Sequence, residues 1–278
     1  MNLMDLLRKS TEWLQEKGVT HARRVVEELV AHAFHCSRMD LYLQYDKPIK
    51  ESELALLRPL LKRAATHEPP AYIIGEVPFF HCTVSVSPDV LIPRPETEVL
   101  LSYVCKKSKP TAKVAWDLCC GSGAMGIALK KAMPQLQVAF SDLSDRALNV
   151  AKENAKKNEI EGIFYQGDLF APFLGQKADI VLVNPPYVSE EEFAFLDRSV
   201  KEFEPKEALL GGRDGLHFYR RLAQEMPPYL HPGAQIFLEI GASQGESVRS
   251  LFTEPHWHSP CLERDWSGQD RFFFIEFV

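Results

Sequence analysis

The stretch VAWDLCCGSGAMGIALKKA, residues 114–132, decides the fold that the sequence predicts. Its first five residues form an apolar run with Asp117 near its end, which is typical of a buried strand in a parallel sheet. Small residues occupy positions 119–123, and residues 124–132 have the composition of a helix. Small residues let the main chain approach a ligand, and a helix N-terminus offers free N–H groups. The stretch therefore predicts a strand, a ligand-binding loop and a helix.

Two further strand-like runs end in acidic residues. The run 137–141 leads to Asp142, at about the distance at which one βα unit presents an acid to the hydroxyls of a ribose. The run 163–166 leads to Asp168 and Leu169, where an acid can accept from an adenine amino group beside an apolar side chain. Both positions are therefore expected to contact a cofactor that contains adenosine.

Other interpretations of these residues stay open. Asp142 can cap a helix expected over residues 147–157, because Asp is favoured at helix N-caps. Gly121, Gly123 and Gly126 also fit the Gly-x-Gly-x-x-Gly pattern of dinucleotide sites, which would make NAD the cofactor. A dehydrogenase does not explain, however, why a second acid and then a different motif follow the next two strands.

That motif is an Asn-Pro-Pro-Tyr corner behind the apolar run 180–183. An amide or exocyclic amine nitrogen is a poor nucleophile because its lone pair is delocalised. The Asn184 side-chain oxygen and the main-chain carbonyl of Pro185 can accept from its two N–H groups and localise that pair. Pro186 stiffens the corner, and the Tyr187 ring can pack against the flat group. The corner predicts a site that methylates a planar nitrogen; a turn that merely ends the strand is the alternative.

Seven motifs are spread over most of the chain: LIPRPETE (91–98), DLCCGSG (117–123), SDLS (141–144), GDLF (167–170), NPPYV (184–188), FEPKEAL (203–209) and DWSGQDR (265–271). Together they resemble the peptide chain release factor glutamine methyltransferases, known as PrmC or HemK. The resemblance implies methyl transfer from S-adenosylmethionine to the side-chain amide of the Gln in the Gly-Gly-Gln motif of release factors, in translation termination. S-adenosylhomocysteine is then the product.

The resemblance also implies an architecture and a role for each motif residue. We expect an α/β fold of the class I S-adenosylmethionine-dependent methyltransferases. It comprises a Rossmann-like seven-stranded sheet, a small N-terminal helical domain and a connecting β-hairpin. By resemblance, Cys119, Cys120, Gly121, Ser122 and Gly123 line the methionine and ribose side of the cofactor, Asp142 holds the ribose hydroxyls, Asp168 and Leu169 flank the adenine, Asn184 borders the cofactor, and Asn184, Pro185, Pro186 and Tyr187 hold the substrate amide.

Cys119 departs from the family pattern, which usually has Gly at this position. A side chain there restricts φ and can crowd the methionine moiety. The adjacent Cys119 and Cys120 also allow redox or metal chemistry as an alternative. No further Cys or His lies at ligand spacing around them, so we expect small apolar side chains and no metal.

The chain is expected to divide near residue 70. Leu and Val recur at helical spacing in residues 1–70, which predicts an N-terminal helical domain for substrate recognition. Alternating β-branched and aromatic residues from Tyr72 to Pro93 predict a hairpin, so 71–95 is assigned as a linker and 96–278 as the catalytic domain. Residues 92–98 lead into a helix; they either border the cofactor and substrate channel or form only a rigid helix entry.

The C-terminal part is expected to complete the sheet. Residues 234–240 are strand-like, a helix follows at 244–252, and a final alternating run spans 272–278. By resemblance, the last two regions form the antiparallel end of the sheet. Glu239 is either a buried acid with a hydrogen-bond partner or a residue that points into the cofactor cleft.

Composition bears on partners and location. Six Cys without framework spacing in 278 residues suggest a reducing cytoplasm, and no apolar stretch approaches the roughly 20 residues of a membrane span. Methyltransferases that act on adenine in nucleic acid use similar Asn-Pro-Pro-Tyr corners and are the main alternative. They must bind a polyanion, whereas this chain has a net charge of −6 and no basic run, so no nucleic acid or membrane partner is expected. A non-catalytic binding module is the third possibility.

Overall fold

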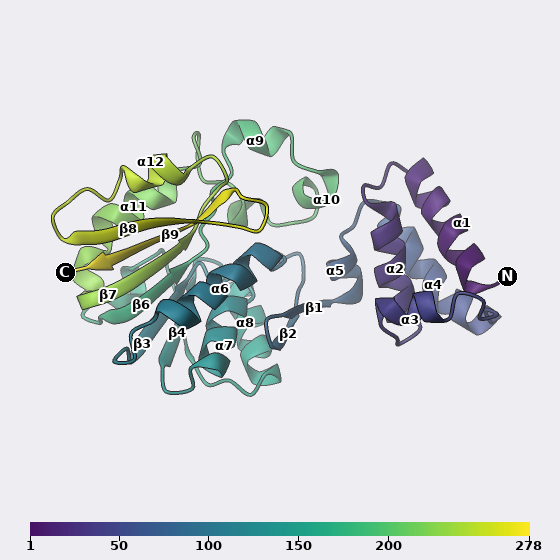
Figure 1. The fold of residues 1–278 in the computed structure, drawn as a ribbon, viewed down its shortest axis with the longest axis horizontal. Coiled ribbons are helices and arrows are strands. Elements are labelled where there is room, and N and C mark those ends of the chain that lie inside the picture. Colours follow the sequence, from purple (N-terminus) through teal and green to yellow (C-terminus); the bar gives the residue numbers. More distant parts are fainter. The chain divides into compact units, whose positions relative to one another are not determined.

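The computed structural model describes all residues, 1–278, and these form two compact units (Figure 1). The first unit comprises Met1–Glu76 together with the short segment Asp197–Phe203. The second unit comprises Val77–Leu196 and Glu204–Val278.

The first unit is helical. It contains α1 (Leu3–Glu16), α2 (Ala22–Ala33), α3 (Arg38–Leu43), α4 (Glu51–Ala64), α5 (Pro70–Ile74) and α10 (Arg198–Lys201). The apolar residues at helical spacing form its core, because each helix turns one stripe toward its neighbours. This core includes Leu3, Leu6, Leu7, Leu14, Val25, Val26, Leu29, Val30, Ala33, Leu57 and Leu61, with Leu54 and Leu60 packed against it.

A segment from far along the chain packs with these helices. Asp197 accepts a hydrogen bond from the Thr20 hydroxyl at 2.8 Å. The Arg198 guanidinium lies 2.8 Å from the ring nitrogen Nε2 of His67. Asp197–Phe203 therefore belongs to the helical unit, although the residues before and after it belong to the second unit.

A short β-hairpin lies at the start of the second unit, where β1 (Glu76–Phe79) and β2 (Cys82–Ser85) form a two-stranded sheet. It is shorter than the hairpin predicted over residues 72–93. Tyr72 lies instead in α5, because Pro at the first helical position favours a helix start, and Gly75 ends that helix with φ of +88°.

The second unit is built on a seven-stranded sheet. Its strands are β3 (Val114–Leu118), β4 (Gln137–Asp142), β5 (Ile163–Gln166), β6 (Ala178–Val183), β7 (Leu230–Glu239), β8 (Trp257–Arg264) and β9 (Asp270–Phe277). They lie in the order β5-β4-β3-β6-β7-β9-β8. Strands β3 to β7 are parallel, whereas β9 is antiparallel to β7 and β8 is antiparallel to β9.

Helices cover both faces of this sheet (Figure 1). One face carries α6 (Pro95–Lys107), α7 (Ala124–Ala132) and α8 (Asp145–Lys157); the other carries α11 (His217–Glu225) and α12 (Gly245–Arg249). Burial on both faces explains why β3 and β6 are apolar except for one Asp in each. Short helices α9 (Glu190–Ala194), η1 (Ala171–Phe173), η2 (Lys206–Ala208) and η3 (Pro227–Tyr229) lie in the connections.

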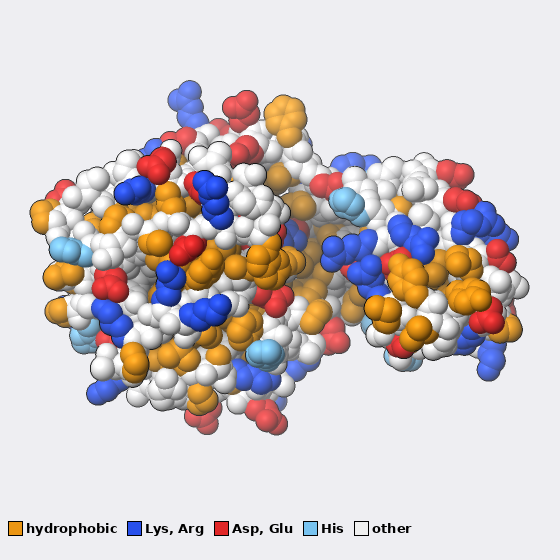
Figure 2. All heavy atoms as spheres, viewed as in Figure 1, with side chains coloured by type: hydrophobic (Ala, Val, Ile, Leu, Met, Phe, Trp, Pro, Cys, Tyr) orange, Lys and Arg blue, Asp and Glu red, His pale blue; other side chains and the backbone are white.

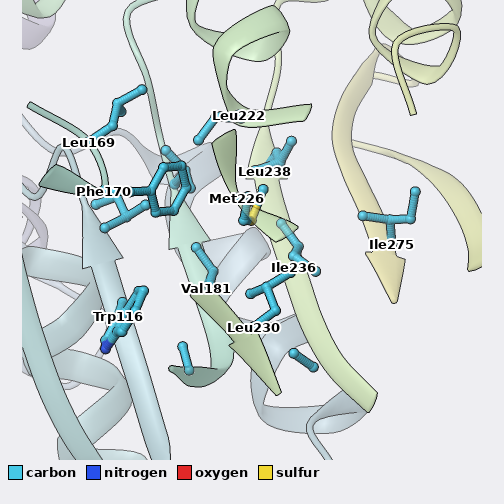
Figure 3. Packing of buried hydrophobic residues seen from close by; sticks show 14 of the residues in the cluster. Trp116, Leu169, Phe170, Val181, Leu222, Met226, Leu230, Ile236, Leu238 and Ile275 are labelled. Carbon is cyan, nitrogen blue, oxygen red and sulfur yellow. The ribbon is translucent and has the colours of Figure 1, made fainter. Parts of the chain in front are cut away.

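One large apolar cluster holds α11 and α12 on the sheet. Trp116 of β3 is 1% exposed and stacks on Phe173 with ring centroids 4.0 Å apart. Figure 3 shows Val181 of β6 and residues of β7 in the same layer as Leu222 of α11. Full burial of side chains of this size contributes about 1.5–3 kcal/mol each, so this layer fixes the sheet beneath the loops that follow its strands.

The antiparallel end differs from the prediction for the C-terminal regions. It is formed by β8 and β9, and the helix predicted over residues 244–252 shrinks to α12. The strand β8 is mostly exposed, and its pairing with β9 shifts register between His258 and Cys261. An exposed edge strand needs no apolar alternation, so its pattern did not indicate a strand.

Acidic and basic side chains are interspersed on both units on the face shown in Figure 2. None of the helices combines the length and the hydropathy that a membrane span needs.

Candidate active site

The loops that carry most of the predicted site residues leave the sheet at one edge. β3 pairs with β4 on one side and with β6 on the other, in parallel register. The chain therefore winds away from β3 in both directions, and ligands bind in the crevice at such a switch point, outside the carboxyl ends of the strands.

The loop after β3 has a left-handed main chain. Cys119 adopts φ of +55° and Gly121 adopts φ of +52°, a region in which a residue with a Cβ is strained. Gly123, at φ of +75°, is the N-cap residue of α7 and has no side chain to offer to the first N–H groups of this helix. Ala124 and Met125 in its first turn line the cavity described below, where free N–H groups favour a carboxylate.

Asp117 is a fully buried acid behind this loop. Its Oδ2 accepts from the Gly126 N–H at 2.8 Å, while Oδ1 has no partner. Gly126 permits this approach, because a Cβ there would lie 2.9 Å from Oδ2 and 2.4 Å from the Phe140 ring. Burial raises the pKa of Asp117 to about 8, and the charge of Asp142 adds to the rise, although the Gly126 hydrogen bond opposes it. The carboxyl is therefore largely protonated at neutral pH.

Asp142, at the end of β4, ties two loops together. One carboxylate oxygen accepts from the Gly121 N–H at 2.9 Å and the other accepts from the Ser144 N–H at 2.9 Å. Burial raises the pKa of Asp142, and these main-chain donors oppose the rise. The helix cap suggested for Asp142 is supplied by Ser144 instead, whose hydroxyl accepts from Ala147 at the start of α8.

Asp168, after β5, is held from the other face of the sheet. Its carboxylate accepts from the Arg221 guanidinium of α11 at 2.8 Å, and its side chain remains 52% exposed. The next residue, Leu169, is buried at φ of +46°. An exposed carboxylate thus stands beside a buried apolar side chain at this end of the crevice.

The corner after β6 is anchored through Tyr187. Pro185 and Pro186 are buried, whereas Asn184 and Tyr187 are partly buried. The Tyr187 hydroxyl donates to the carboxylate of Glu239 in β7 at 3.3 Å. Glu239 is itself buried and hydrogen-bonded, so it is the first of the two alternatives considered for this residue.

These loops surround one cavity of about 390 Å³, which is within the roughly 300–1,000 Å³ range of small-molecule sites. Gly123, Pro185 and Tyr187 do not line it, and no group of three or more His, Cys, Asp and Glu is arranged to hold a metal ion. The predicted site residues that do line it are Cys119, Cys120, Gly121, Ser122, Asp142, Asp168, Leu169, Asn184 and Pro186.

Comparison with known proteins identifies the family. The sequence matches the Methyltransferase small domain over residues 95–203 and the PrmC N-terminal domain over residues 5–75. It is 37% identical over 269 residues to a release factor glutamine methyltransferase of Geobacter sulfurreducens, covering 95% of this chain and 94% of that protein. The chain belongs to the release factor glutamine methyltransferases. A Bacillus cereus protein of the same name is 37% identical over 285 residues, or 99% of each chain.

Membership of the release factor glutamine methyltransferases confirms the resemblance and shows that the protein is a methyltransferase. The fold class is confirmed as well. A crystal structure of a methyltransferase from Pyrococcus furiosus superposes with a TM-score of 0.54, covering 71% of this chain and 89% of that one at 16% identity.

Several cavity residues of this family member were not predicted as site residues. Pro93, Arg94 and Thr97 line the cavity, so the segment 92–98 is more than a helix entry. Glu207 lines it from η2, in a motif that the resemblance named without giving it a role. Leu91, Pro205 and Ala208 of the motifs 91–98 and 203–209 also line the cavity. The remaining wall includes Asp89, Val90 and Phe218, for which no local pattern gave a signal.

Proposed function

We propose that this enzyme transfers a methyl group from S-adenosylmethionine to the side-chain amide nitrogen of the Gln in the Gly-Gly-Gln motif of release factors. The observation that carries the proposal is that one cavity joins the loops after β3, β4 and β5 to Asn184 at the corner after β6. The residues proposed to bind the nucleoside and the Asn184 side chain proposed to bind the substrate amide therefore line the same cavity. The names of the Geobacter and Bacillus relatives, release factor glutamine methyltransferases, support this choice of substrate.

The residues present fit the cofactor. The two oxygens of Asp142 each accept one main-chain N–H and keep acceptor capacity for the two hydroxyls of a ribose. The first N–H groups of α7, at Ala124 and Met125, suit the carboxylate of the methionine moiety, and Asp168 beside Leu169 suits the adenine. When bound, S-adenosylmethionine supplies a methyl group on a cationic sulfur and leaves as S-adenosylhomocysteine.

The chain's own contribution at the acceptor is to localise a lone pair and to hold the amide in line. The Asn184 oxygen and the Pro185 carbonyl accept from the two N–H groups of the substrate amide, which raises the electron density on its nitrogen. The Tyr187 ring packs beside the amide plane and limits its rotation. No strong base is needed, because the nitrogen can release its proton to water as the new bond forms.

Residues 1–70 are proposed as the substrate-recognition domain, 71–95 as the linker and 96–278 as the catalytic domain. Eight of the fourteen large hydrophobic side chains that are exposed lie in the first 70 residues, which is about a quarter of the chain. Exposed apolar side chains in such number are typical of a protein-binding surface. They include Met39, Tyr42, Leu43, Tyr45 and Leu56.

We further propose that the enzyme works in the cytoplasm and binds neither nucleic acid nor a membrane directly. Support comes from six free cysteines and from a net charge of −6, which is unfavourable for contact with a polyanion.

A labelling experiment tests the substrate. The protein is incubated with radiolabelled S-adenosylmethionine and, separately, with a bacterial-type release factor, a ribosomal protein and duplex DNA. We expect label in the release factor alone. Label in DNA, with an affinity that falls steeply as salt rises, would instead establish the nucleic-acid alternative.

A further inference from the structure

Glu239 is a buried acid whose role in the reaction is not explained by the cavity lining. It ends β7, next to the strand that carries the Asn-Pro-Pro-Tyr corner, and its residue is 1% exposed. Its carboxylate accepts from the Thr97 hydroxyl at 2.7 Å and from the Tyr187 hydroxyl at 3.3 Å. One buried carboxylate thus joins the acceptor corner to α6.

The main chain of the corner is held by other contacts. The carbonyl of Tyr187 accepts from the side chain of Gln244 at 2.9 Å. Val188 exchanges main-chain hydrogen bonds with the opposite loop, to Leu209 and from Gly211. A Cβ on Gly215 would lie 2.3 Å from the Tyr187 carbonyl oxygen, so this loop also packs directly against the corner. The Tyr187 ring itself packs against the apolar cluster of the sheet, and its hydroxyl is fixed by the contact with Glu239.

The other end of the connection reaches the cavity. Thr97 lies in the first turn of α6 and lines the cavity, as does Arg94 just before that helix. A second buried acid, Glu204, accepts from the Ile92 N–H at 3.1 Å and pairs with Arg94. Glu204 therefore holds the segment before α6, while Glu239 holds the first turn of α6 and Tyr187.

The charge of Glu239 is balanced locally. Burial raises the pKa of its carboxyl, while the Thr97 hydrogen bond and the nearby Arg271 oppose that rise. Arg271 is positioned by Asp265 at 3.3 Å and by the Ile240 carbonyl at 3.3 Å. A carboxyl kept in such a position, with two hydroxyl donors directed at it, is costly to bury unless all its partners are in place.

We propose that Glu239 is a positioning residue of the methyl-transfer reaction, which holds the Tyr187 ring through its hydroxyl and aligns it with Thr97 in the cavity wall. The inference rests on the proposed function, because it assigns Tyr187 to the substrate amide. Glu239 acts through Tyr187 and touches neither the substrate nor the cofactor.

The test uses the full chain, an intact release factor and three single variants. Tyr187→Phe keeps the ring and removes the hydroxyl, Glu239→Leu removes both acceptors, and Glu239→Gln keeps one acceptor and similar volume. We expect Tyr187→Phe and Glu239→Leu each to lower kcat about tenfold, with KM and the S-adenosylhomocysteine affinity within about twofold. The double variant should lose no more than either single, and Glu239→Gln should restore most of kcat.

The proposal would be overturned if the two single-variant losses of kcat multiplied in the double variant, or if kcat were unchanged in Tyr187→Phe. The Tyr187→Phe result decides this even if Glu239→Leu fails to fold. A readout without turnover separates this proposal from the substrate assignment. With the eight tyrosines fluorinated, the Tyr187 resonance should move in Glu239→Leu and stay near its place in Glu239→Gln. A Tyr187 resonance that moves in neither variant refutes the contact with Glu239. A release factor that takes up no label from S-adenosylmethionine refutes only the proposed function.

Discussion

The Asp142 carboxylate accepts a hydrogen bond from the main-chain N–H of Gly121 at 2.9 Å, so the end of β4 holds the loop that follows β3. This contact brings the acid and the small-residue loop to the same wall of the cavity. It also orients the carboxylate before any ligand arrives, which lowers the cost of binding.

Asp142→Ala is expected to weaken S-adenosylhomocysteine binding by about 1–3 kcal/mol, because two charge-assisted hydrogen bonds to the ribose would be lost. Isothermal calorimetry measures the change. Ser144→Ala is the matched control, since it removes the cap of α8 and leaves Asp142 in place. Equal effects of the two substitutions would reduce Asp142 to a structural residue.

Asn184→Ala is expected to lower kcat on the order of a hundredfold and to leave S-adenosylhomocysteine affinity within about a few-fold. The reason is that its oxygen matters most as the lone pair of the substrate nitrogen localises. Steady-state kinetics with intact release factor provides the measurement. A higher KM at unchanged kcat would show that Asn184 binds substrate uniformly, contrary to the mechanism.

Asp117 gives the stability of the protein a distinct pH dependence. Burial raises the pKa of Asp117 to about 8, whereas an Asp in an unfolded chain has a pKa of about 3.9. Between these values the folded chain binds a proton that the unfolded chain lacks, so this contribution to stability is lost as pH rises through the window. Asp117→Asn mimics the protonated form and should gain about 4 kcal/mol relative to wild type between about pH 5 and about pH 9, at about 1.36 kcal/mol for each pH unit in the window. If the unfolding free energies of wild type and Asp117→Asn change equally with pH across that range, the raised pKa of Asp117 is contradicted.

Local sequence patterns were sufficient to predict the strand and the helix on either side of the small-residue loop in the cavity wall. The strand over 114–118 and the helix over 124–132 occur at their predicted bounds, because buried parallel strands and small-residue loops have a strong local signal. Asp142 and Asn184 line the cavity, and both were predicted as site residues because Asp142 ends a strand-like run and Asn184 follows an apolar one.

Tertiary packing brings together residues whose proximity no local sequence pattern indicates. Phe218 of α11 and Glu207 of η2 enter the cavity wall from distant parts of the sequence, and only the folded chain brings them there. The pairing of Asp168 with Arg221 spans 53 positions, and no spacing rule connects them. Cys119 adopts a left-handed φ of +55°, which the composition of the loop alone does not require of a Cys.

Removing residues 1–70 tests the proposed recognition domain. S-adenosylhomocysteine affinity should stay within about twofold, because every cavity residue lies later in the chain. The kcat/KM for intact release factor should fall at least about tenfold, or 1.4 kcal/mol, while a short Gln-containing peptide should be equally poor for both proteins. Thr20→Val is the control for Asp197, which loses this partner in the deletion. Full-rate methylation by the shortened chain would end the recognition role.

The position of the transferred methyl group is the sharpest test of the proposed function. An intact release factor is treated with the enzyme and S-adenosylmethionine and then mapped by tandem mass spectrometry, beside a release factor whose Gly-Gly-Gln glutamine is replaced by Ala. The proposed function predicts one methyl group on the side-chain amide nitrogen of that Gln and none in the variant. A methyl group on any other residue, or equal methylation of the variant, would contradict it.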